Sequence, residues 1–312
     1  MFTLLRGQAR LVHPEKHGLD PTEGMAPVRQ SACPGSWPGL GASRSLQICP
    51  RIGQTQYAVT EREIRIKTTD GAMKVFIARP DGGGPFPVAM VYMDGVGYRD
   101  QIKENARRFA AGGYYCVAPD LYYRSGDDLS FDFSKIASEG MSGEEGNRLR
   151  AAASSVTPEH AMADTKAILD ELRSDPLAAT GAKVCVGYCM GARIALRAAS
   201  FTDEFVAAAG IHPGALVTDN PDSPHHDLAR VRGELYYAFA EIDRSATREV
   251  VDRFRDELHR NRVRGVVERI PGVAHGFAMA DLPVYNHQAS EHHFERTLDL
   301  WRRNLSQEPS RT

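Results

Sequence analysis

"KVCVGYCMGARIALRAA", residues 183–199, is an apolar run that leads through a Gly-x-Cys-x-Gly turn into small and apolar residues at helical spacing. The apolar run predicts a buried strand, and the spacing after the turn predicts a helix. Two explanations fit Cys189 at this turn. Either the glycines let strand and helix pack closely around a small apolar side chain, or Cys189 is a nucleophile held out at a strained turn. The rest of the chain has to decide between them.

Strands alternate with helices on both sides of this stretch. Two alternating segments, 60–68 and 72–80, predict a half-buried hairpin across "TDG". Further strands are predicted at 85–95, 114–120, 204–214, 233–243 and 264–272, and helices at 99–113, 157–175, 246–261 and 287–304. This alternation predicts an α/β fold with a doubly wound, mostly parallel sheet and helices on both faces. In such sheets the active site lies at the carboxyl ends of the strands.

Composition narrows the class of protein. Lys and Arg number 38 and Asp and Glu 40, which gives a net charge of -2 and no reason to expect nucleic acid or an anionic membrane as partner. The sequence contains no apolar run of about 18 residues, so no membrane-spanning helix is expected. The five cysteines are odd in number and have no CxxC spacing, which favours a reducing cytoplasm over a disulfide framework or a structural zinc site.

The domain organisation follows from where periodicity begins. Residues 1–56 are rich in Pro, Gly, Ser and Gln and predict a mobile or partly ordered extension, in which Met25 is an alternative start. Residues 57–312 are predicted to form a single α/β domain. Within it, residues 125–156 are long and polar, which indicates a cap or pocket-edge loop rather than a part of the sheet.

A nucleophile needs a base, and the base needs an orienting acid. Asp243 ends one predicted strand and His275 follows the next, so both lie at strand ends where they can meet Cys189. The main rival for the acid is Glu241, two residues earlier, but the strand-end position favours Asp243. At the turn, the helix N-terminus stabilises negative charge, and the amide of Met190 points toward a developing oxyanion.

Other histidines and cysteines have simpler interpretations. Two adjacent pairs lack further ligand spacing and are expected on solvated faces: His225 with His226, and His292 with His293. His212 ends a strand beside the proposed site and is expected to line the pocket. Cys116 and Cys185 lie within predicted strands and are expected in the core.

Four motifs together resemble one family: "VAPDLYYR" (117–124), "VGYCMGA" (186–192), "FAEID" (239–243) and "VAHGF" (273–277). The combination is similar to the dienelactone hydrolases, or carboxymethylenebutenolidases, which are α/β-hydrolases with a cysteine nucleophile. The resemblance covers about residues 57–305. It implies Cys189 as nucleophile, Asp243 as acid and His275 as base.

The resemblance also implies roles around this triad. Asp94 stands where the family has an acidic residue that contacts the resting cysteine, and the amide of Gly95 would be a second oxyanion donor. Arg124 matches one of two arginines that bind the substrate carboxylate, whereas Met279 stands in place of the other. Half of the carboxylate clamp is therefore missing, which favours a more neutral or larger substrate. Tyr188, next to the nucleophile, is a further candidate for substrate binding.

The sequence thus predicts a soluble, cytoplasmic cysteine hydrolase that cleaves a small-molecule lactone or carboxylic ester through an acyl-enzyme, without metal or organic cofactor. Two alternatives stay open. One is a redox or acyl-transfer protein that uses the Cys189 thiol, and the other is a non-catalytic hydrolase-like binding protein. The residues favour neither a monomer nor a homo-oligomer.

Overall fold

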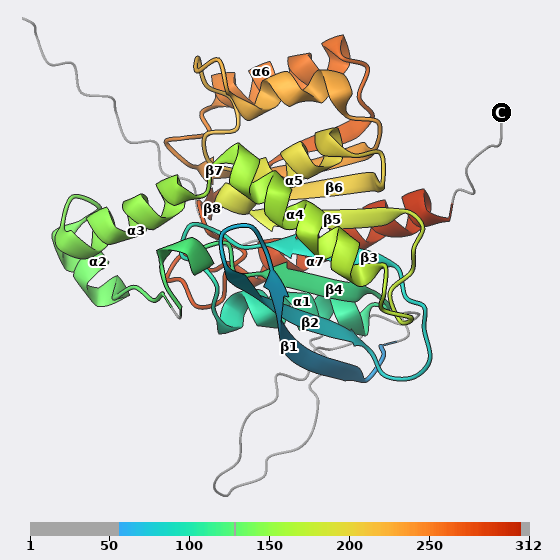
Figure 1. Cartoon of the computed structure of the whole chain (residues 1–312). Coiled ribbons are helices and arrows are strands. Elements are labelled where there is room, and N and C mark those ends of the chain that lie inside the picture. Colours follow the sequence, from blue (N-terminus) through green and yellow to red (C-terminus); the bar gives the residue numbers. More distant parts are fainter. Residues whose placement is uncertain (1–55, 128, 307–312) are drawn as a thin grey trace, which may run out of the picture. The chain divides into compact units, whose positions relative to one another are not determined.

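The computed structural model describes residues 56–127 and 129–306. In this part of the chain, eight strands form one sheet in the order β1-β2-β4-β3-β5-β6-β7-β8 (Figure 1). The expected N-terminal extension lies almost wholly outside the described residues, as do Met25, Cys33 and Cys49, so the proposed domain boundaries stay predictions.

The hairpin predicted across "TDG" is confirmed. β1 (Val59–Lys67) and β2 (Ala72–Pro80) pair antiparallel, with Lys67 opposite Ala72. β1 forms an edge of the sheet and is mostly exposed, while β2 is almost entirely buried because it also pairs with β4 (Tyr115–Pro119).

The remaining strand pairs are parallel, as the alternation of strands and helices predicts. The strands are β3 (Val88–Tyr92), β4, β5 (Lys183–Tyr188), β6 (Phe205–Ile211), β7 (Glu234–Ile242) and β8 (Gly265–Ala274). The central strands are buried along nearly their whole length, because helices cover both faces of the sheet.

Figure 1 shows two groups of helices on opposite faces of the sheet. On one face lie α1 (Asp100–Ala111) and α7 (His287–Leu305), joined by the packing of Phe109 against Phe294 and Trp301. On the other face lie α4 (Pro158–Leu172), α5 (Met190–Phe201) and α6 (Arg248–Arg260). The doubly wound fold predicted from the sequence is therefore confirmed.

Local signals set the ends of several helices. Thr157 caps α4, where its hydroxyl accepts a hydrogen bond from the amide of His160 at 3.2 Å, and Pro158 occupies the first turn. α1 ends at Gly112, as its sequence predicts. These signals lie in the sequence itself, which explains why the helix boundaries were predictable.

The segment between β4 and α4 contains no strand among its described residues. It forms a short 3-10 turn, η1 (Tyr123–Ser125), followed by α2 (Phe133–Glu139) and α3 (Glu144–Ser155). In Figure 1, α2 and α3 extend away from the sheet. The segment is therefore a helical insertion that follows β4 and lies outside the sheet, and its role as a cap or pocket edge stays a prediction.

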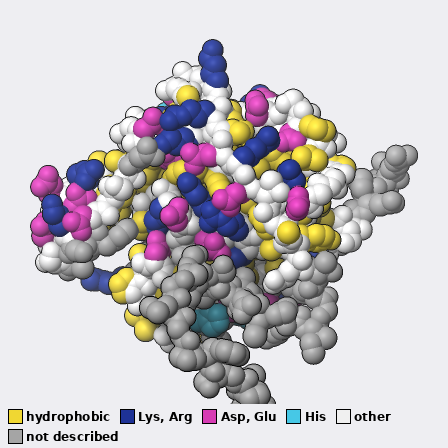
Figure 2. Space-filling view, turned by 90° about the horizontal axis from the view of Figure 1, so that it is seen from below, with side chains coloured by type: hydrophobic (Ala, Val, Ile, Leu, Met, Phe, Trp, Pro, Cys, Tyr) yellow, Lys and Arg dark blue, Asp and Glu magenta, His cyan; other side chains and the backbone are white. Residues whose placement is uncertain are grey.

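Charged side chains of both signs are interspersed over the face shown in Figure 2. No single-sign patch dominates its described surface, in keeping with a net charge of -2. None of the described helices is both long enough and apolar enough to span a bilayer.

Candidate active site

Cys189 occupies the tight turn between β5 and α5. Its backbone has φ 51° and ψ -107°, a left-handed region that residues with a side chain rarely adopt. The turn is held on the neighbouring strand, because the Cys189 amide donates a hydrogen bond to the Ile211 carbonyl at 2.9 Å. The cysteine side chain is thereby placed at the carboxyl edge of the sheet, at the start of a helix.

The two glycines of the turn are required sterically. A Cβ at Gly187 would lie 1.9 Å from the carbonyl oxygen of Gly191, and one at Gly191 would lie 2.5 Å from the carbonyl oxygens of Tyr92 and Met93. Such contacts involve backbone atoms that cannot move aside. The Gly-x-Cys-x-Gly pattern thus packs strand against helix and, in the same arrangement, holds the cysteine in its strained conformation.

The structure brings Cys189, His275 and Asp243 together. His275 follows β8 and Asp243 follows β7, so both reach the same sheet edge as the cysteine. Nε2 of His275 lies 3.0 Å from Sγ of Cys189, and Nδ1 of His275 lies 2.6 Å from Oδ2 of Asp243. The imidazole therefore bridges a thiol and a carboxylate, which is the arrangement of a nucleophile, base and orienting acid.

Asp243 is fixed by a residue that the sequence analysis missed. The amide and the hydroxyl of Ser245 both donate to Oδ1 of Asp243, at 2.8 and 2.7 Å. Burial alone would raise the pKa of Asp243, but the hydrogen bonds from His275 and Ser245 outweigh it and lower the pKa below its ordinary value. The D-x-S spacing, which is typical of an Asx turn, is the sequence signal that predicts this contact.

The environment of His275 favours its protonated form. Burial opposes the charge, but hydrogen bonds to Asp243 and Cys189 and the charges of both partners outweigh it and raise the pKa of His275 to about 10. The His275 ring can therefore accept a proton and hold it next to the Cys189 sulfur.

Glu241, the rival acid, is engaged elsewhere. Its carboxylate accepts a hydrogen bond from Arg269 at 2.9 Å and another from the amide of Gly272 at 2.8 Å. The geometry therefore favours Asp243 as the partner of the histidine.

The two amides expected to bind an oxyanion flank the cysteine from different elements. Met190 is the first residue of α5, where amides lack a partner within the helix. Gly95 follows β3, and the Tyr122 hydroxyl donates to its carbonyl at 2.7 Å, which fixes that peptide. A Cβ at Gly95 would meet no atom within 4 Å, so its Cα borders open space.

Asp94 is buried and is bound by an arginine. Arg99 donates to both of its carboxylate oxygens, at 2.7 and 3.0 Å, and the amide of Val96 donates to it at 3.0 Å. Arg99 also donates to Asp281, at 2.5 and 3.1 Å. Burial raises the pKa of Asp94 in spite of Arg99. The hydrogen bonds of Asp94 thus go to Arg99 and Val96, whereas Cys189 is bound by His275.

Neither residue of the expected carboxylate clamp faces the cysteine with free donors. Arg124 forms two hydrogen bonds with the fully buried carboxylate of Asp164, at 2.7 and 2.8 Å, and a third with Asp70 at 2.7 Å. Met279 is fully buried, and its sulfur lies 3.8 Å from the side-chain nitrogen of Asn105. In this structure, the donors of Arg124 are therefore used by two aspartates, and Met279 is packed inside the protein.

Tyr188 and His212 lie behind the triad rather than in an open pocket. Both are buried, with ring centroids 5.9 Å apart, and the His212 ring lies 5.2 Å from that of His275. Burial, the charge of His275 and that of His293 lower the pKa of His212 well below its ordinary value, so this ring is neutral. An uncharged His212 ring therefore packs against the ring of His275.

The expectation of solvated faces for the paired histidines is wrong for one member of each pair. His225 lies in the 3-10 turn η2 (Pro224–Arg230), is buried, and bonds Ser223 Oγ at 2.7 Å. His293 is fully buried against Phe294 in α7. Successive residues of a helix point in different directions, so one of two adjacent histidines faces inward. The cysteine prediction is confirmed, because Cys116 and Cys185 are both fully buried.

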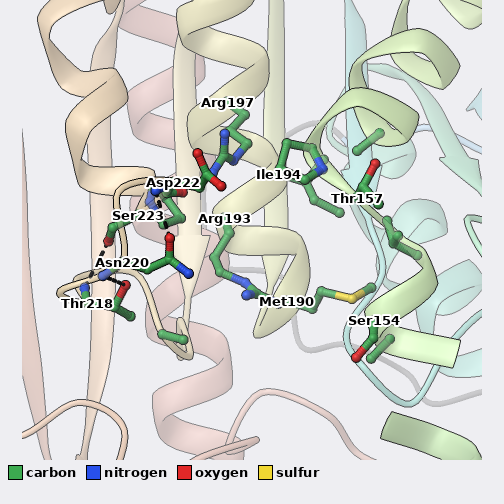
Figure 3. Close-up of a pocket in the computed structure, with 16 residues that line it drawn as sticks. Ser154, Thr157, Met190, Arg193, Ile194, Arg197, Thr218, Asn220, Asp222 and Ser223 are labelled. Atoms are coloured by element: carbon green, nitrogen blue, oxygen red, sulfur yellow. Dashed lines mark hydrogen bonds between the residues drawn. The ribbon is translucent and has the colours of Figure 1, made fainter. Parts of the chain in front are cut away.

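A cavity of about 540 Å³ is lined by residues of α5, the helix that begins directly after Cys189 (Figure 3). It lies between α5, the start of α4 with the end of α3, and the loop before η2. Its lining includes Met190 and Ala215, the neighbours of Cys189 and Gly214. A Cβ at Gly214, which directly precedes the lining residue Ala215, would lie 3.9 Å from Sγ of Cys189. Arg193, which also lines it, was not singled out from the sequence, although it stands four residues after the cysteine.

Comparisons with known proteins identify the family and the fold. The sequence profile of the Dienelactone hydrolase family matches residues 73–305. A candidate carboxymethylenebutenolidase from Methylorubrum extorquens is 25% identical over 273 residues, which cover 84% of this chain and 89% of the relative.

Solved structures show the same fold. A candidate dienelactone hydrolase from Klebsiella pneumoniae has a TM-score of 0.68 at 21% identity, covering 78% of this chain and 99% of the other. An esterase from Pyrobaculum calidifontis has a TM-score of 0.55 at 18% identity, covering 80% and 87% of the two chains. With a family profile that spans most of its length and the fold of an α/β-hydrolase, this chain belongs to the dienelactone hydrolase family.

Proposed function

We propose that the protein cleaves a lactone or carboxylic ester by nucleophilic attack of Cys189, through an acyl-enzyme. Membership of the family makes it a hydrolase of ester bonds. The observation that carries the cysteine mechanism is the bridging position of His275, 3.0 Å from the sulfur and 2.6 Å from the Asp243 carboxylate. If Cys189 served only for packing, His275 would not need to contact both its sulfur and the Asp243 carboxylate.

Each step has a residue to perform it. The Cys189 sulfur attacks the carbonyl carbon, and His275 holds the proton that leaves the thiol. The amides of Met190 and Gly95 bind the oxyanion. Collapse of the intermediate expels the alkoxide, which takes the proton from His275 and leaves a thioester on Cys189. Water then attacks the thioester with His275 as base, which releases the acid and restores the thiol.

The substrate is not bound through a carboxylate held by two arginines at the family's clamp positions. Met279 is buried, and the donors of Arg124 bind two aspartates. The relative from Methylorubrum extorquens is named a candidate carboxymethylenebutenolidase. By analogy we propose a lactone or ester substrate, whose contacts beyond the reacting carbonyl come from other parts of the pocket.

A redox role for Cys189 has less support. Among the described residues the other cysteines are Cys116 and Cys185, both with 0% exposure, so neither is available as a resolving thiol. A nucleophilic thiol works only when reduced, and a reducing cytoplasm is the proposed compartment. A binding protein without activity would not require His275 and Asp243 to be aligned with Cys189.

Intact-mass analysis with activated esters and lactones tests the proposal. The wild type is expected to gain the mass of the acyl group transiently and to release the acid. Cys189→Ala should show neither event, while Cys116→Ala, a matched control at a buried cysteine, should keep both. Undiminished turnover in Cys189→Ala would show that the nucleophile is wrong, and mixed disulfides without acylation would favour the redox alternative.

A further inference from the structure

Arg193 is the cation nearest to the proposed nucleophile on α5. It stands four residues after Cys189, so the two residues share a face of the helix. Long side chains in helices lean toward the N-terminus. Figure 3 shows this for Arg193, whose side chain runs along α5 toward Met190 and into the cavity of about 540 Å³. Its guanidinium therefore lies between the cavity and the reacting end of the helix.

The guanidinium of Arg193 has no carboxylate partner. Within residues 56–127 and 129–306 it makes no hydrogen bond and no ion pair. The second arginine of the cavity, Arg197, does have partners. Arg197 pairs with Asp227 at 3.2 Å and donates to the carbonyl of Asp222 at 2.5 Å. The Asp222 carboxylate also lines the cavity but lies beyond ion-pair distance of Arg193. Arg193 thus supplies this space with a positive charge that has no carboxylate partner among the described residues.

An arginine without a carboxylate partner can bind an anion from solution. Arg193 is half-buried, and burial and the neighbouring Arg197 lower its pKa, while the charge of Cys189 acts in the opposite direction. Natural proteins seldom leave such a group without a partner. The fork of a guanidinium matches a carboxylate with two hydrogen bonds.

The rest of the lining suits a short polar or apolar chain that ends in an anion. The lining combines hydroxyl and amide side chains, among them Ser154, Thr157 and Asn220, with apolar ones, among them Ile194 and Pro224. Ser154 and Thr157 come from the end of α3 and the start of α4, and Asn220 comes from the loop before η2. Ile194 lies on α5, and Pro224 begins η2. Met190 and Ala215 both line this space, and we expect a substituent of the acyl group on Cys189 to enter it past one of them.

We propose that Arg193 binds a carboxylate carried by the ester or lactone substrate, in the cavity beside Met190. The inference rests on hydrolysis at Cys189. It assigns the anion-binding role to α5 in a chain where Arg124 is bound to aspartates and Met279 is buried. Arg193 is then a specificity-determining residue, and its charge selects anionic over neutral substrates.

Matched substrates test this selection. 4-Nitrophenyl hemiglutarate carries a carboxylate on the acyl side, 4-acetoxybenzoate carries one on the alcohol side, and 4-nitrophenyl butyrate and phenyl acetate are the neutral partners. Arg193→Met should lower kcat/KM by roughly 10-fold to 100-fold for at least one anionic ester, mainly through KM, since a charge-assisted hydrogen-bonded pair is lost. The matching neutral ester should change by less than about 3-fold.

Two further variants complete the comparison. Arg193→Lys keeps the charge without the fork and should restore part of the preference. Arg248→Met, at an arginine with 80% exposure on α6, should behave like the wild type. Equal losses for anionic and neutral esters in Arg193→Met would overturn the proposal and would mean that this charge acts on the sulfur instead.

A readout without turnover separates the inference from the proposed hydrolysis. Iodoacetamide alkylates a free thiol, and mass spectrometry of the peptide that contains Cys189 follows the rate at this cysteine separately from the other four. Glutarate should slow this reaction in the wild type at concentrations where glutaramide does not, and Arg193→Met should abolish the difference. Protection in the absence of any ester hydrolysis would support the anion site while contradicting the hydrolase mechanism, and equal effects of the acid and the amide would overturn the site.

Discussion

Arg99 binds both carboxylate oxygens of Asp94, at 2.7 and 3.0 Å, and through its other donors binds Asp281. Asp94 has only 2% exposure and directly precedes Gly95, whose amide is one of the proposed oxyanion donors. Arg99→Met would leave a buried carboxylate without its partner, and we expect a loss of about 3–5 kcal/mol in the free energy of unfolding. Urea unfolding at neutral pH measures this loss.

Arg107 provides the matched control for this prediction. It lies on α1, the helix that Arg99 precedes as N-cap, and it pairs with Glu61, but both partners are partly exposed. Arg107→Met should therefore cost no more than about 1 kcal/mol. The double variant Arg99→Met with Asp94→Asn should recover much of the lost stability, because the uncompensated charge is removed. Equal stability of the two single variants would contradict the buried-pair account.

The choice of Asp243 over Glu241 predicts a difference between two conservative substitutions. Asp243→Asn keeps the size of the side chain but removes the charge that orients and stabilises the His275 ring, and kcat should fall by roughly 10²-fold to 10⁴-fold. Glu241→Gln removes a charge that is paired with Arg269 and hydrogen-bonded to the Gly272 amide, away from His275, and kcat should stay within about 3-fold of the wild type. Steady-state kinetics with one activated ester decides, and reversed outcomes would make Glu241 the acid.

His275 should remain protonated well above neutral pH. Its pKa of about 10 results from hydrogen bonds and charges of Asp243 and Cys189 that outweigh burial. We expect the imidazole nitrogens to titrate near that value in ¹⁵N NMR of the wild type. In Cys189→Ala the sulfur contributions vanish, so the pKa should fall markedly, while Cys116→Ala should leave it unchanged. An unaltered titration in Cys189→Ala would show that sulfur does not hold the proton on the ring.

The same shift predicts the sign of a pH effect on stability. A histidine whose folded pKa is raised stabilises the native state fully below its unfolded pKa of about 6.5, and this contribution disappears as pH rises through the folded value near 10. The difference in free energy of unfolding between the wild type and His275→Gln should therefore decrease from pH 6 to pH 10. A difference that grows over this range would contradict the assignment.

The sequence predicts features that depend on local signals. The turn at Cys189 is readable because its glycines are steric necessities, and Thr157 and Gly112 mark helix ends. The meeting of Asp243 and His275 is also predictable, since parallel strands end at one edge of the sheet. These features need only the order of the strands, which the alternation of elements supplies.

Features that depend on competing partners are not predictable in this way. A motif places Arg124 near the site, but only the fold shows that Asp164, forty residues further along the chain, binds its guanidinium. Asp94 likewise meets Arg99 instead of the cysteine. His293 is buried because α7 turns it toward the sheet, which a polar local sequence conceals. Such contacts are decided by tertiary packing and charge pairing.

The cysteine turn itself yields the most demanding prediction. A methyl group at Gly187 would lie 1.9 Å from the Gly191 carbonyl oxygen, and both atoms belong to backbone that strand and helix hold in place. Gly187→Ala should therefore lose more than about 4 kcal/mol of stability or fail to accumulate as folded protein. Gly181→Ala is the control, because a Cβ there meets nothing within 4 Å and should change stability by no more than about 1 kcal/mol. Soluble yield and thermal unfolding measure both variants. A folded Gly187→Ala protein with normal stability would show that the turn can relax, and the strained conformation of Cys189 would then not depend on its glycines.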